Sequence, residues 1–324
     1  MAETTMKYRR LGRAGMQVSE VALGSWLTYG NGVGDDTAAQ CVRTAYDLGI
    51  NFFDTANVYA TGEAEKVYGK VLREYPRDTI VVATKVYFPM RSGPNGSGLG
   101  RKHIREQIDA SLDRLGMDYV DLYQCHRWDA DTPVEETILA MEDLVKAGKI
   151  LYYGVSEWSA AQIEQGQNVA QSRGLYGMVS NQPYYNMLGR SIEREVIPTC
   201  ERHGIGQVIF SPLAQGVLTG KYLPGVPAPA GTRATDEKMS VFMRPGEGNL
   251  GDEALTRVQS LALIAKRLGI SMGQLALAWI LRLPNISSVI VGASRPEQVV
   301  QNAGASGITL NEATLAEIEK MLAV

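Results

Sequence analysis

The stretch TPVEETILAMEDLVKAGKILYYGVS, residues 132–156, shows the pattern that decides the fold, a helix followed at once by a buried strand. Pro133 at the first helical position and Gly148 just past the last one predict where this helix begins and ends. Thr132 and Glu135 have the spacing of a capping box, with Thr132 as the N-cap. The last seven residues, ILYYGVS, are largely apolar without alternation, which is typical of a strand covered on both faces in a parallel sheet.

The same alternation runs along the whole chain. The segment DDTAAQCVRTAYDLG (35–49) has acids in its first turn and Gly49 at its end, which predicts another helix of this kind. Eight short apolar runs separated by helical segments predict an α/β fold, a (β/α)8 TIM barrel, as a single domain over residues 1–324. The predicted strands are VALGS (21–25), NFFDT (51–55), IVVATK (80–85), VDLYQCH (120–126), ILYYGVS (150–156), MVSNQ (178–182), QVIFSP (207–212) and VIVGAS (289–294).

Three segments depart from the simple repeat. Residues 6–19 predict a β-hairpin before the first barrel strand, with its turn at Gly12 to Gly15, and we expect it to close the bottom of the barrel. A Gly- and Ser-rich loop covers residues 87–100. About 75 residues separate the seventh strand from the eighth, beginning with a Gly/Pro-rich segment and continuing with the predicted helix DEALTRVQSLALIAKRLG. Both long loops are expected at the carboxyl-terminal face, as a lid or a specificity loop.

Composition excludes several classes of protein. Of the 324 residues 45% are hydrophobic, and the net charge of -3 comes without a Lys/Arg cluster, so nucleic acid is not an expected partner. Cys41, Cys125 and Cys200 are odd in number and far apart, which indicates reduced core residues. The N-terminal MAETTMKYRRLG lacks the apolar stretch of a signal peptide, and no run of about 18 apolar residues suggests a membrane span. We therefore expect a cytoplasmic protein with no membrane partner.

Four polar residues fall where barrel enzymes carry their active sites, at the carboxyl ends of the strands. Asp54 ends the second predicted strand, Lys85 the third and His126 the fourth, and Tyr59 follows in the loop after the second. Each alone has a structural explanation, as a turn-forming acid, a solvated strand end, a packed imidazole or a packed ring. Together they favour one functional group, because a buried lysine needs a countercharge and Asp54 can supply it.

Such a group is suited to polarising a carbonyl. Lys85 would favour the ionised phenol of Tyr59 and lower a pKa that starts near 10, so that Tyr59 could protonate a developing alkoxide. His126 would donate a hydrogen bond to the same oxygen and orient the substrate. A Schiff-base aldolase that uses Lys85 as its nucleophile is the alternative from another reaction class.

Other catalytic classes lack their sequence signals. GVSEW (154–158) misses the second glycine of a nucleophile elbow. His103, His126 and His203 lie on separate elements without metal-ligand spacing, so no metal is expected. GNGVGDD (30–36) lacks the third glycine of a Rossmann fingerprint. A bound hydride donor is the remaining natural choice.

The phosphate site of such a barrel lies after the seventh and eighth strands. Ser294 precedes Pro296 at a predicted helix start, where free N–H groups and the helix dipole favour phosphate. Arg295 and Arg233 could add positive charge. An ordinary N-cap at Ser294 explains the same residues.

At these residues the sequence resembles the aldo-keto reductase superfamily, and within it the bacterial reductases related to voltage-gated potassium-channel β subunits. The similarity covers almost the whole chain, and its specific segments are GINFFDTANVYATGEAE, VVATKV, YVDLYQCHRWDADTPVEETILAMEDLVKAGKILYYGVSEWS and FSPLAQGVLTGKY. The resemblance implies a reductase of aldehydes and ketones with NADPH/NADP+ as cofactor. The catalytic tetrad of the family falls on Asp54, Tyr59, Lys85 and His126, with Tyr59 as general acid.

The resemblance also implies contacts for the cofactor and the substrate. The nicotinamide positions are Trp26, Asp54, Ser156, Asn181 and Gln182, with Phe210 stacked on the ring. The pyrophosphate positions are Ser211, Pro212, Leu213, Gly216 and Lys221. The positions around the 2′-phosphate are Arg233, Gly292, Ser294, Arg295, Gln298 and Asn302. The small carbonyl substrate would contact Trp26, Tyr29, Tyr59, Tyr87, His126 and Trp128.

Three positions differ from relatives in this superfamily. Channel β subunits often have Asn at the position of His126, so histidine here favours turnover. Glu157 stands where those subunits have Arg, and Gln301 replaces a usual Glu near the adenine. Because the channel subunits assemble as tetramers, the resemblance also implies a possible homo-oligomer, tetramer or larger. It leaves a rival function open, an NADPH-binding redox sensor with little turnover.

Overall fold

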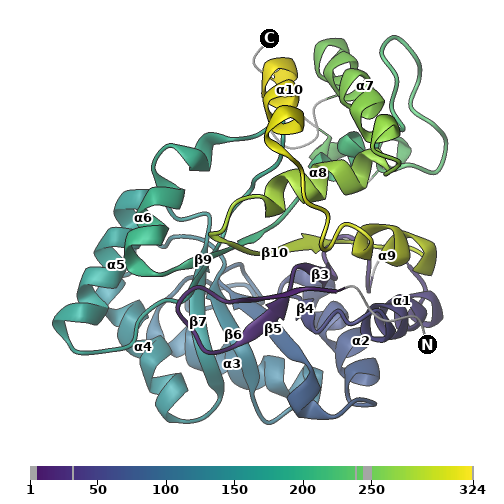
Figure 1. The fold of residues 1–324 in the computed structure, drawn as a ribbon. Coiled ribbons are helices and arrows are strands. Elements are labelled where there is room, and N and C mark those ends of the chain that lie inside the picture. Colours follow the sequence, from purple (N-terminus) through teal and green to yellow (C-terminus); the bar gives the residue numbers. More distant parts are fainter. Residues whose placement is uncertain (1–5, 31–32, 238, 244–249, 323–324) are drawn as a thin grey trace.

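Eight parallel strands close into a barrel in the computed structural model, which describes residues 6–30, 33–237, 239–243 and 250–322 (Figure 1). Strands that follow one another in the chain pair in parallel, and β10 returns to β3 to complete the ring. The predicted TIM barrel is therefore confirmed. The barrel strands are β3 (Val21–Gly24), β4 (Phe52–Asp54), β5 (Val81–Val86), β6 (Val120–Cys125), β7 (Ile150–Ser156), β8 (Ser180–Gln182), β9 (Gly206–Ile209) and β10 (Ile286–Val291).

Helices surround the barrel and bury its outer face (Figure 1). The helices that follow the barrel strands are α1 (Asp35–Asp47), α2 (Glu63–Leu72), α3 (Arg101–Leu115), α4 (Val134–Lys146), α5 (Ala160–Ser172), α6 (Val196–His203), α8 (Met272–Leu281) and α9 (Pro296–Ala303). Two more helices, α7 (Asp252–Arg267) and α10 (Glu312–Leu322), pack against each other outside this ring. The 3-10 turns cover Tyr59–Gly62, Arg77–Thr79, Ser191–Glu193, Ala214–Thr219, Arg233–Thr235 and Ser240–Phe242.

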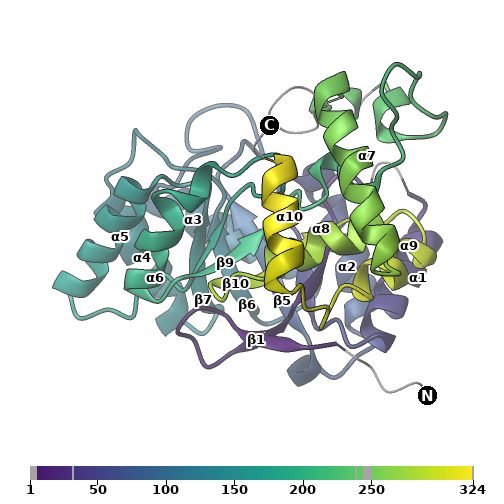
Figure 2. The ribbon, with the colours of Figure 1, turned by 45° about the horizontal axis from the view of Figure 1, so that its top comes forward.

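The predicted N-terminal hairpin, β1 (Tyr8–Arg10) paired with β2 (Gln17–Ser19), crosses one end of the barrel (Figure 2). Leu11, Ala14 and Val18 are fully buried, and they pack against the inward-facing apolar residues of the barrel strands. The hairpin therefore closes the bottom of the barrel, as expected from the sequence.

The hairpin turn needs glycine at position 12. Gly12 has a φ of 55°, in the left-handed region. A Cβ at this position would lie 2.5 Å from the carbonyl oxygens of both Val179 and Gly204. The turn can therefore approach the barrel strands only without a side chain.

Shortening Leu11 is expected to destabilise the protein. Leu11→Ala leaves a cavity under the barrel, and large-to-small changes at fully buried sites cost about 2–5 kcal/mol. Urea unfolding of both proteins measures this loss. Leu151→Ala, at a leucine that is 43% exposed, is the matched control. An equal loss in the two variants would contradict the role assigned to the hairpin.

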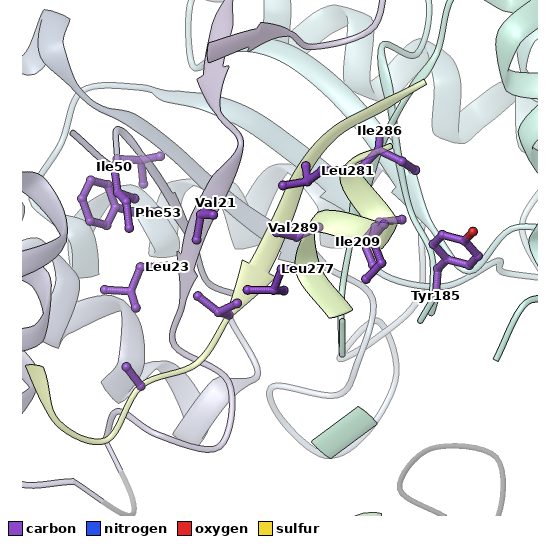
Figure 3. Close-up of a cluster of buried hydrophobic side chains, with 14 of the residues drawn as sticks. Val21, Leu23, Ile50, Phe53, Tyr185, Ile209, Leu277, Leu281, Ile286 and Val289 are labelled. Atoms are coloured by element: carbon purple, nitrogen blue, oxygen red, sulfur yellow. The ribbon is translucent and has the colours of Figure 1, made fainter. Parts of the chain in front are cut away.

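The main hydrophobic core lies between the strands and the helices. Leu277 and Leu281 of α8 pack beside Val289 of β10 and Ile209 of β9 (Figure 3). Nine of the ten residues of α8 are buried, and Gln274 is half-buried. Such burial removes the contrast of apolar and polar faces by which a surface helix is recognised in a sequence, so α8 was not predicted.

A capping box was nevertheless present as a signal for α8. The Ser271 hydroxyl accepts a hydrogen bond from the backbone N–H of Gln274, and the Gln274 side chain accepts one from the Ser271 N–H. A serine followed three residues later by glutamine, just before an apolar run, is a typical helix start.

The capping box predicted at Thr132 is wrong. Helix α4 begins at Val134, its N-cap is Pro133, and no side chain caps it. The Thr132 hydroxyl instead donates to Asp129 Oδ2 at 2.7 Å. Asp129 also accepts from the backbone N–H of Leu99, so a carboxylate in the preceding turn competes for the hydroxyl.

No single helix among the described residues has the length and apolar composition to cross a membrane. Helices α7 and α8 meet that criterion only when taken together, and they are bent by 89° relative to each other.

Two parts of the sequence discussed above, residues 1–5 at the N-terminus and residues 31–32 of GNGVGDD, lie outside the described residues.

Candidate active site

Three neighbouring strands bring the four predicted tetrad residues together. Asp54 ends β4, Lys85 lies near the end of β5 and His126 directly follows β6. Tyr59 opens a 3-10 turn after β4, and its ring centre lies 4.9 Å from Lys85 Nζ. Asp54, Lys85 and His126 are only 3%, 0% and 6% exposed, whereas Tyr59 is half-buried. The group is therefore shielded from water except at Tyr59.

Lys85 is held by three oxygen acceptors. Its Nζ donates to Asp54 Oδ1 at 2.5 Å, to the Thr55 carbonyl oxygen at 2.7 Å and to Tyr59 Oη at 3.3 Å. Burial favours the neutral amine, but the charge of Asp54 and the contact with Tyr59 outweigh it, so the pKa of Lys85 is raised. Lys85 therefore keeps its proton at neutral pH.

Two amides fix the other oxygen of Asp54. Gln182 Nε2 donates to Asp54 Oδ2 at 2.9 Å, and Gln124 Nε2 lies 3.4 Å from the same oxygen. Gln182 was predicted to contact the nicotinamide, and here its side chain orients the tetrad carboxylate. Gln124 was missed, because nothing in the sequence marks which interior residue of a strand faces the site.

The turn that carries Tyr59 is strained. Ala60 and Thr61 have φ angles of 49° and 54°, in a region that residues with a Cβ usually avoid. Gly62 follows with a φ of 93°, and a Cβ there would lie 2.6 Å from Arg114 Cδ. The chain thus accepts strain to place the Tyr59 phenol over Lys85.

The predicted direction of the Tyr59 pKa shift is wrong for this structure. Burial of the phenol raises the pKa, and although the charge of Lys85 lowers it, the net direction is upward. The sequence showed the lysine but not that burial of the phenol would outweigh the effect of its charge on the pKa. Tyr59 is consequently protonated throughout the neutral range, which is the state that a proton donor needs.

His126 faces Tyr59 as a neutral imidazole. The two ring centres are 5.7 Å apart, and the rings meet edge to face. Burial lowers the pKa of His126 well below its usual value, and the positive charges of Lys85 and Arg127 lower it further. Among the described residues nothing hydrogen-bonds His126 Nδ1, which is buried. A buried polar atom without a partner points to a missing ligand or water.

The lowered pKa of His126 predicts a specific dependence of stability on pH. As pH falls below about 6.5, the unfolded chain takes up a proton at this histidine and the native state does not. The free energy of unfolding should therefore fall with decreasing pH, by at most about 1.4 kcal/mol per pH unit for each such group.

His126→Gln should flatten this slope between pH 7 and pH 5, as measured by urea unfolding at each pH. A residual slope is expected, because burial also lowers the pKa of His103. The variant His203→Gln is a control at a histidine paired with Glu164 near the surface. An unchanged slope in His126→Gln would refute the neutral buried state of His126.

Aromatic rings that pack around Trp26 line part of the mouth of the site. The Trp26 ring lies 6.5 Å from the rings of both Tyr59 and Phe210, and 5.2 Å from that of Phe242. Phe242 comes from the long segment between β9 and α7, so this segment returns over the mouth. Aromatic walls with a few polar groups are typical of small-molecule sites.

Phe88 lies beside His126 at the mouth. Its ring lies 4.9 Å from the His126 ring and 5.2 Å from that of Tyr87, a predicted substrate contact. Phe88 and Phe242 were both missed from the sequence. They lie in long loops without regular periodicity, so no pattern indicated which of their rings would reach the tetrad.

Two other predicted pocket residues lie differently. Tyr29 is 2% exposed and packs edge-on against Tyr68, 5.7 Å away, in the main core. We therefore remove Tyr29 from the proposed pocket. Trp128 packs against Trp158 at 4.7 Å and is half-buried, so its contact with a substrate stays a prediction.

The loop after β9 forms a strained backbone cradle. Ser211, Ala214 and Gln215 have φ angles of 50°, 47° and 57°, and Gly216 has one of 96°. Successive residues in such conformations can turn their N–H groups toward a common anion. A Cβ on Gly216 would lie 3.2 Å from Lys221 Nζ, so glycine leaves room for the lysine. The same loop contains two other predicted contacts, Pro212 and Leu213.

Three cations gather near this loop. Burial and the charges of Arg233 and Arg295 lower the pKa of Lys221. Arg233 donates to Gln215 Oε1, and Arg295 is 3.9 Å from Glu297. Within the described part of the chain, no carboxylate forms an ion pair with Lys221 or Arg233. This uncompensated positive charge beside the start of α9 suits an anionic ligand.

The start of α9 differs from a simple serine cap. Its N-cap is Arg295, without a side-chain bond to the helix, so the N-cap alternative for Ser294 is wrong. The Ser294 N–H and hydroxyl donate to Gln298 Oε1 at 2.8 and 3.2 Å. Asn302, on the same helix, is buried. Gly292, which precedes this helix in the chain, lies close to Thr28.

Ser156 and Asn181 belong to the next strands around the barrel. Ser156, at the end of β7, donates from Oγ to the Gln182 carbonyl oxygen at 2.8 Å. Asn181 donates from Nδ2 to Gln207 Oε1 at 3.1 Å, and its buried Oδ1 meets no donor among the described residues. An unsatisfied acceptor of this kind could bind an amide N–H.

Comparison with known proteins settles the family. The model of the Aldo/keto reductase family matches residues 20–323. The chain belongs to the aldo/keto reductase family. Curated relatives match this chain along most of their length. A probable voltage-gated potassium channel subunit beta from Oryza sativa subsp. japonica is 44% identical over 300 residues, 92% of this chain and 90% of the relative.

Two further relatives of this aldo/keto reductase have similar names. A probable voltage-gated potassium channel subunit beta from Arabidopsis thaliana is 42% identical over 322 residues, 98% of this chain and 97% of its own. A putative voltage-gated potassium channel subunit beta from Schizosaccharomyces pombe (strain 972 / ATCC 24843) is 42% identical over 303 residues, 92% and 87% of the two chains.

Aldo/keto reductases are oxidoreductases that generally bind NAD(P)H and act on small carbonyl compounds. The residues of this aldo/keto reductase fit such a cofactor. The cradle at Ala214 to Gly216 and the unpaired charges of Lys221 and Arg233 suit phosphate groups. The unsatisfied oxygen of Asn181 suits a carboxamide. Among the described residues, no three His, Cys, Asp or Glu side chains form a possible metal site.

Proposed function

We propose that this protein is an NADPH-dependent reductase of aldehydes and ketones, with Tyr59 as the general acid. The observation that carries this proposal is the hydrogen-bonded chain from Asp54 through Lys85 to Tyr59. A phenol bonded to a buried ammonium, with a neutral imidazole beside it, is suited to giving its proton to a carbonyl oxygen. The family assignment supports oxidoreductase chemistry in general.

The protein residues prepare the carbonyl oxygen for reduction. When bound, a reduced nicotinamide supplies a hydride for the carbonyl carbon. Tyr59 donates its proton to the oxygen as negative charge develops there, and the charge of Lys85 stabilises the phenolate that remains. Asp54 keeps Lys85 charged, and the neutral ring of His126 positions the oxygen.

The surrounding residues would bind the cofactor and exclude water. The cations suited to the phosphates of the cofactor are Lys221, Arg233 and Arg295. With three cations present, one would be available for the 2′-phosphate that NADPH has and NADH lacks, which favours NADPH. Trp26 and Phe210 would flank the nicotinamide, together with Ser156, Asn181 and Gln182 as proposed contacts. The rings of Phe88 and Phe242 close the mouth and favour an apolar substrate body.

Lys85 is poorly suited to the alternative aldolase chemistry. A Schiff base requires an unprotonated amine, but the pKa of Lys85 is raised by its pairing with Asp54, against the effect of burial. Borohydride trapping of a carbonyl substrate on Lys85 would revive this alternative.

A panel of aldehydes and ketones tests the proposed function, with NADPH and NADH assayed side by side through cofactor absorbance. We expect turnover of some aldehydes, 4-nitrobenzaldehyde among them, and a lower KM for NADPH than for NADH. No turnover across the panel despite NADPH binding would contradict the proposal.

The names of the relatives favour a second candidate function. All three are described as voltage-gated potassium channel β subunits. The protein would then be an NADPH-binding redox sensor in the cytoplasm, assembled as a homo-oligomer, tetramer or larger. Tight NADPH binding, negligible turnover and a tetrameric mass by light scattering would together favour this function.

A further inference from the structure

Arg127 stands beside the tetrad without a role in the mechanism above. It directly follows His126 and is half-buried. Its Nη1 donates to the His126 carbonyl oxygen at 2.5 Å and lies 3.5 Å from Ser156 Oγ. Its guanidinium carbon lies 5.5 Å from the centre of the Phe88 ring. These contacts hold the guanidinium in one place at the mouth of the site.

One edge of this guanidinium is left available. Arginine has five N–H donors, and the contacts of Arg127 to described residues use Nη1 alone. Its Nε and Nη2 therefore remain as a pair, which is the fork that binds a carboxylate through two parallel hydrogen bonds. At the rim of a binding site such a fork is suited to a ligand group of opposite charge.

The positive charge of Arg127 is also without an ion-pair partner in the described part of the chain. No carboxylate of the described residues forms an ion pair with it, whereas the Lys85 charge is balanced by Asp54. Glu157, the residue directly after Ser156, uses Oε1 to accept a hydrogen bond from the Tyr184 N–H at 2.6 Å. Arg127 therefore differs from Lys85 in having no ion pair with a carboxylate of the described residues.

Arg127 lies close enough to the reacting group to act on a substrate. Phe88 contacts both the Arg127 guanidinium and the His126 ring, and His126 contacts Tyr59. Burial dominates the pKa values of Tyr59 and His126, yet the charge of Arg127 lowers both. A molecule whose carbonyl reaches Tyr59 is therefore exposed to the electrostatic field of the Arg127 charge.

We propose that Arg127 is a specificity-determining residue that binds the carboxylate of the substrate through its Nε–Nη2 edge. The preferred substrates are then aldehydes or ketones whose aromatic or short apolar body also carries a carboxylate. The aromatic walls at Trp26 and Phe88 bind the body, and Tyr59 receives the carbonyl oxygen. This inference rests on the proposed carbonyl reductase function.

Binding of a carboxylated product tests Arg127 without requiring turnover. The probes are 4-(hydroxymethyl)benzoate and the uncharged 4-nitrobenzyl alcohol, titrated calorimetrically into the protein saturated with NADP+. Arg127→Met should weaken binding of the benzoate about ten- to hundred-fold, and weaken the alcohol far less. Arg127→Lys should be intermediate, because an ammonium lacks the planar fork. Arg105→Met, at an exposed arginine of α3, controls for net charge.

Steady-state kinetics make the same comparison with two aldehyde substrates, 4-carboxybenzaldehyde and 4-nitrobenzaldehyde. Arg127→Met should lower the ratio of their kcat/KM values at least ten-fold, mainly through the KM of the carboxylated aldehyde. An unchanged ratio and unchanged benzoate affinity would overturn the role of Arg127 while leaving the reductase function intact. If neither aldehyde reacts with the wild-type protein, the proposed function fails, and the calorimetric comparison still decides whether Arg127 binds carboxylates.

Discussion

Replacing Tyr59 with phenylalanine is expected to lower kcat for aldehyde reduction about 100- to 10,000-fold, the usual contribution of a general acid. The substitution removes one hydroxyl, and the ring can keep its contacts with Trp26 and His126. Lys85 retains Asp54 and the Thr55 carbonyl as acceptors, so its charge stays satisfied. The loss should therefore fall on catalysis and not on folding.

Steady-state kinetics and NADPH titration separate these effects. The affinity for NADPH should change less than about three-fold, since the phenol donates to the substrate and not to the cofactor. Tyr46→Phe is the matched control, because its phenol contacts Thr79 on the outside of the barrel. Equal kcat values for wild type and Tyr59→Phe would remove Tyr59 from its proposed role.

Breaking the buried pair of Lys85 and Asp54 should produce the largest loss of stability. Lys85→Met leaves the Asp54 carboxylate buried without its cation, and removal of one partner from a buried ion pair costs about 3–5 kcal/mol. Gln182 and Gln124 would still donate to Asp54, but neither amide carries the charge that Lys85 provides.

A double-mutant cycle identifies the origin of this loss. Asp54→Asn leaves the Lys85 ammonium without a countercharge, whereas the double variant Asp54→Asn/Lys85→Met contains no buried charge at either position. Its free energy of unfolding in urea should fall by less than the sum of the two single losses. Additive losses would show that the two side chains stabilise the protein independently.

Much of the barrel was predictable because local patterns and global fold agree. Most of the eight barrel strands are short apolar runs, although β8 is Ser180–Gln182, and α1 and α4 have clear helical signals at their ends. The exceptions have specific causes. Helix α8 is buried at nine of its ten residues and so lacks a polar face. The hydroxyl of Thr132 binds Asp129 instead of capping α4, because two potential partners lay within reach and the sequence did not rank them.

The tetrad was predictable for a topological reason. Residues at the carboxyl ends of neighbouring parallel strands must meet, so Asp54, Lys85 and His126 could be placed from strand positions alone. The direction of the Tyr59 pKa shift was not predictable, because it depends on a balance between burial and Lys85 that only the packed structure determines. The predicted roles of these residues, as distinct from their positions, await the kinetic experiments.

The loops limited what the sequence could predict about the pocket. Phe88 and Phe242 reach the mouth from segments without regular periodicity, whereas Tyr29, close in sequence to Trp26, turns into the core. Arg127 follows the tetrad histidine and was overlooked, since its significance depends on the absence of a carboxylate partner among the described residues. Such an absence is visible only once the neighbours of the guanidinium are known.

Isotope transfer tests the central claim most directly. NADPH carrying two deuterium atoms at C4 of the nicotinamide is incubated with the protein and 4-nitrobenzaldehyde, and the alcohol is analysed by mass spectrometry and NMR. We expect one deuterium on the carbinol carbon, with formation of this alcohol slowed at least 100-fold in Tyr59→Phe. Alcohol without deuterium at that carbon, or no alcohol despite bound NADPH, would contradict it.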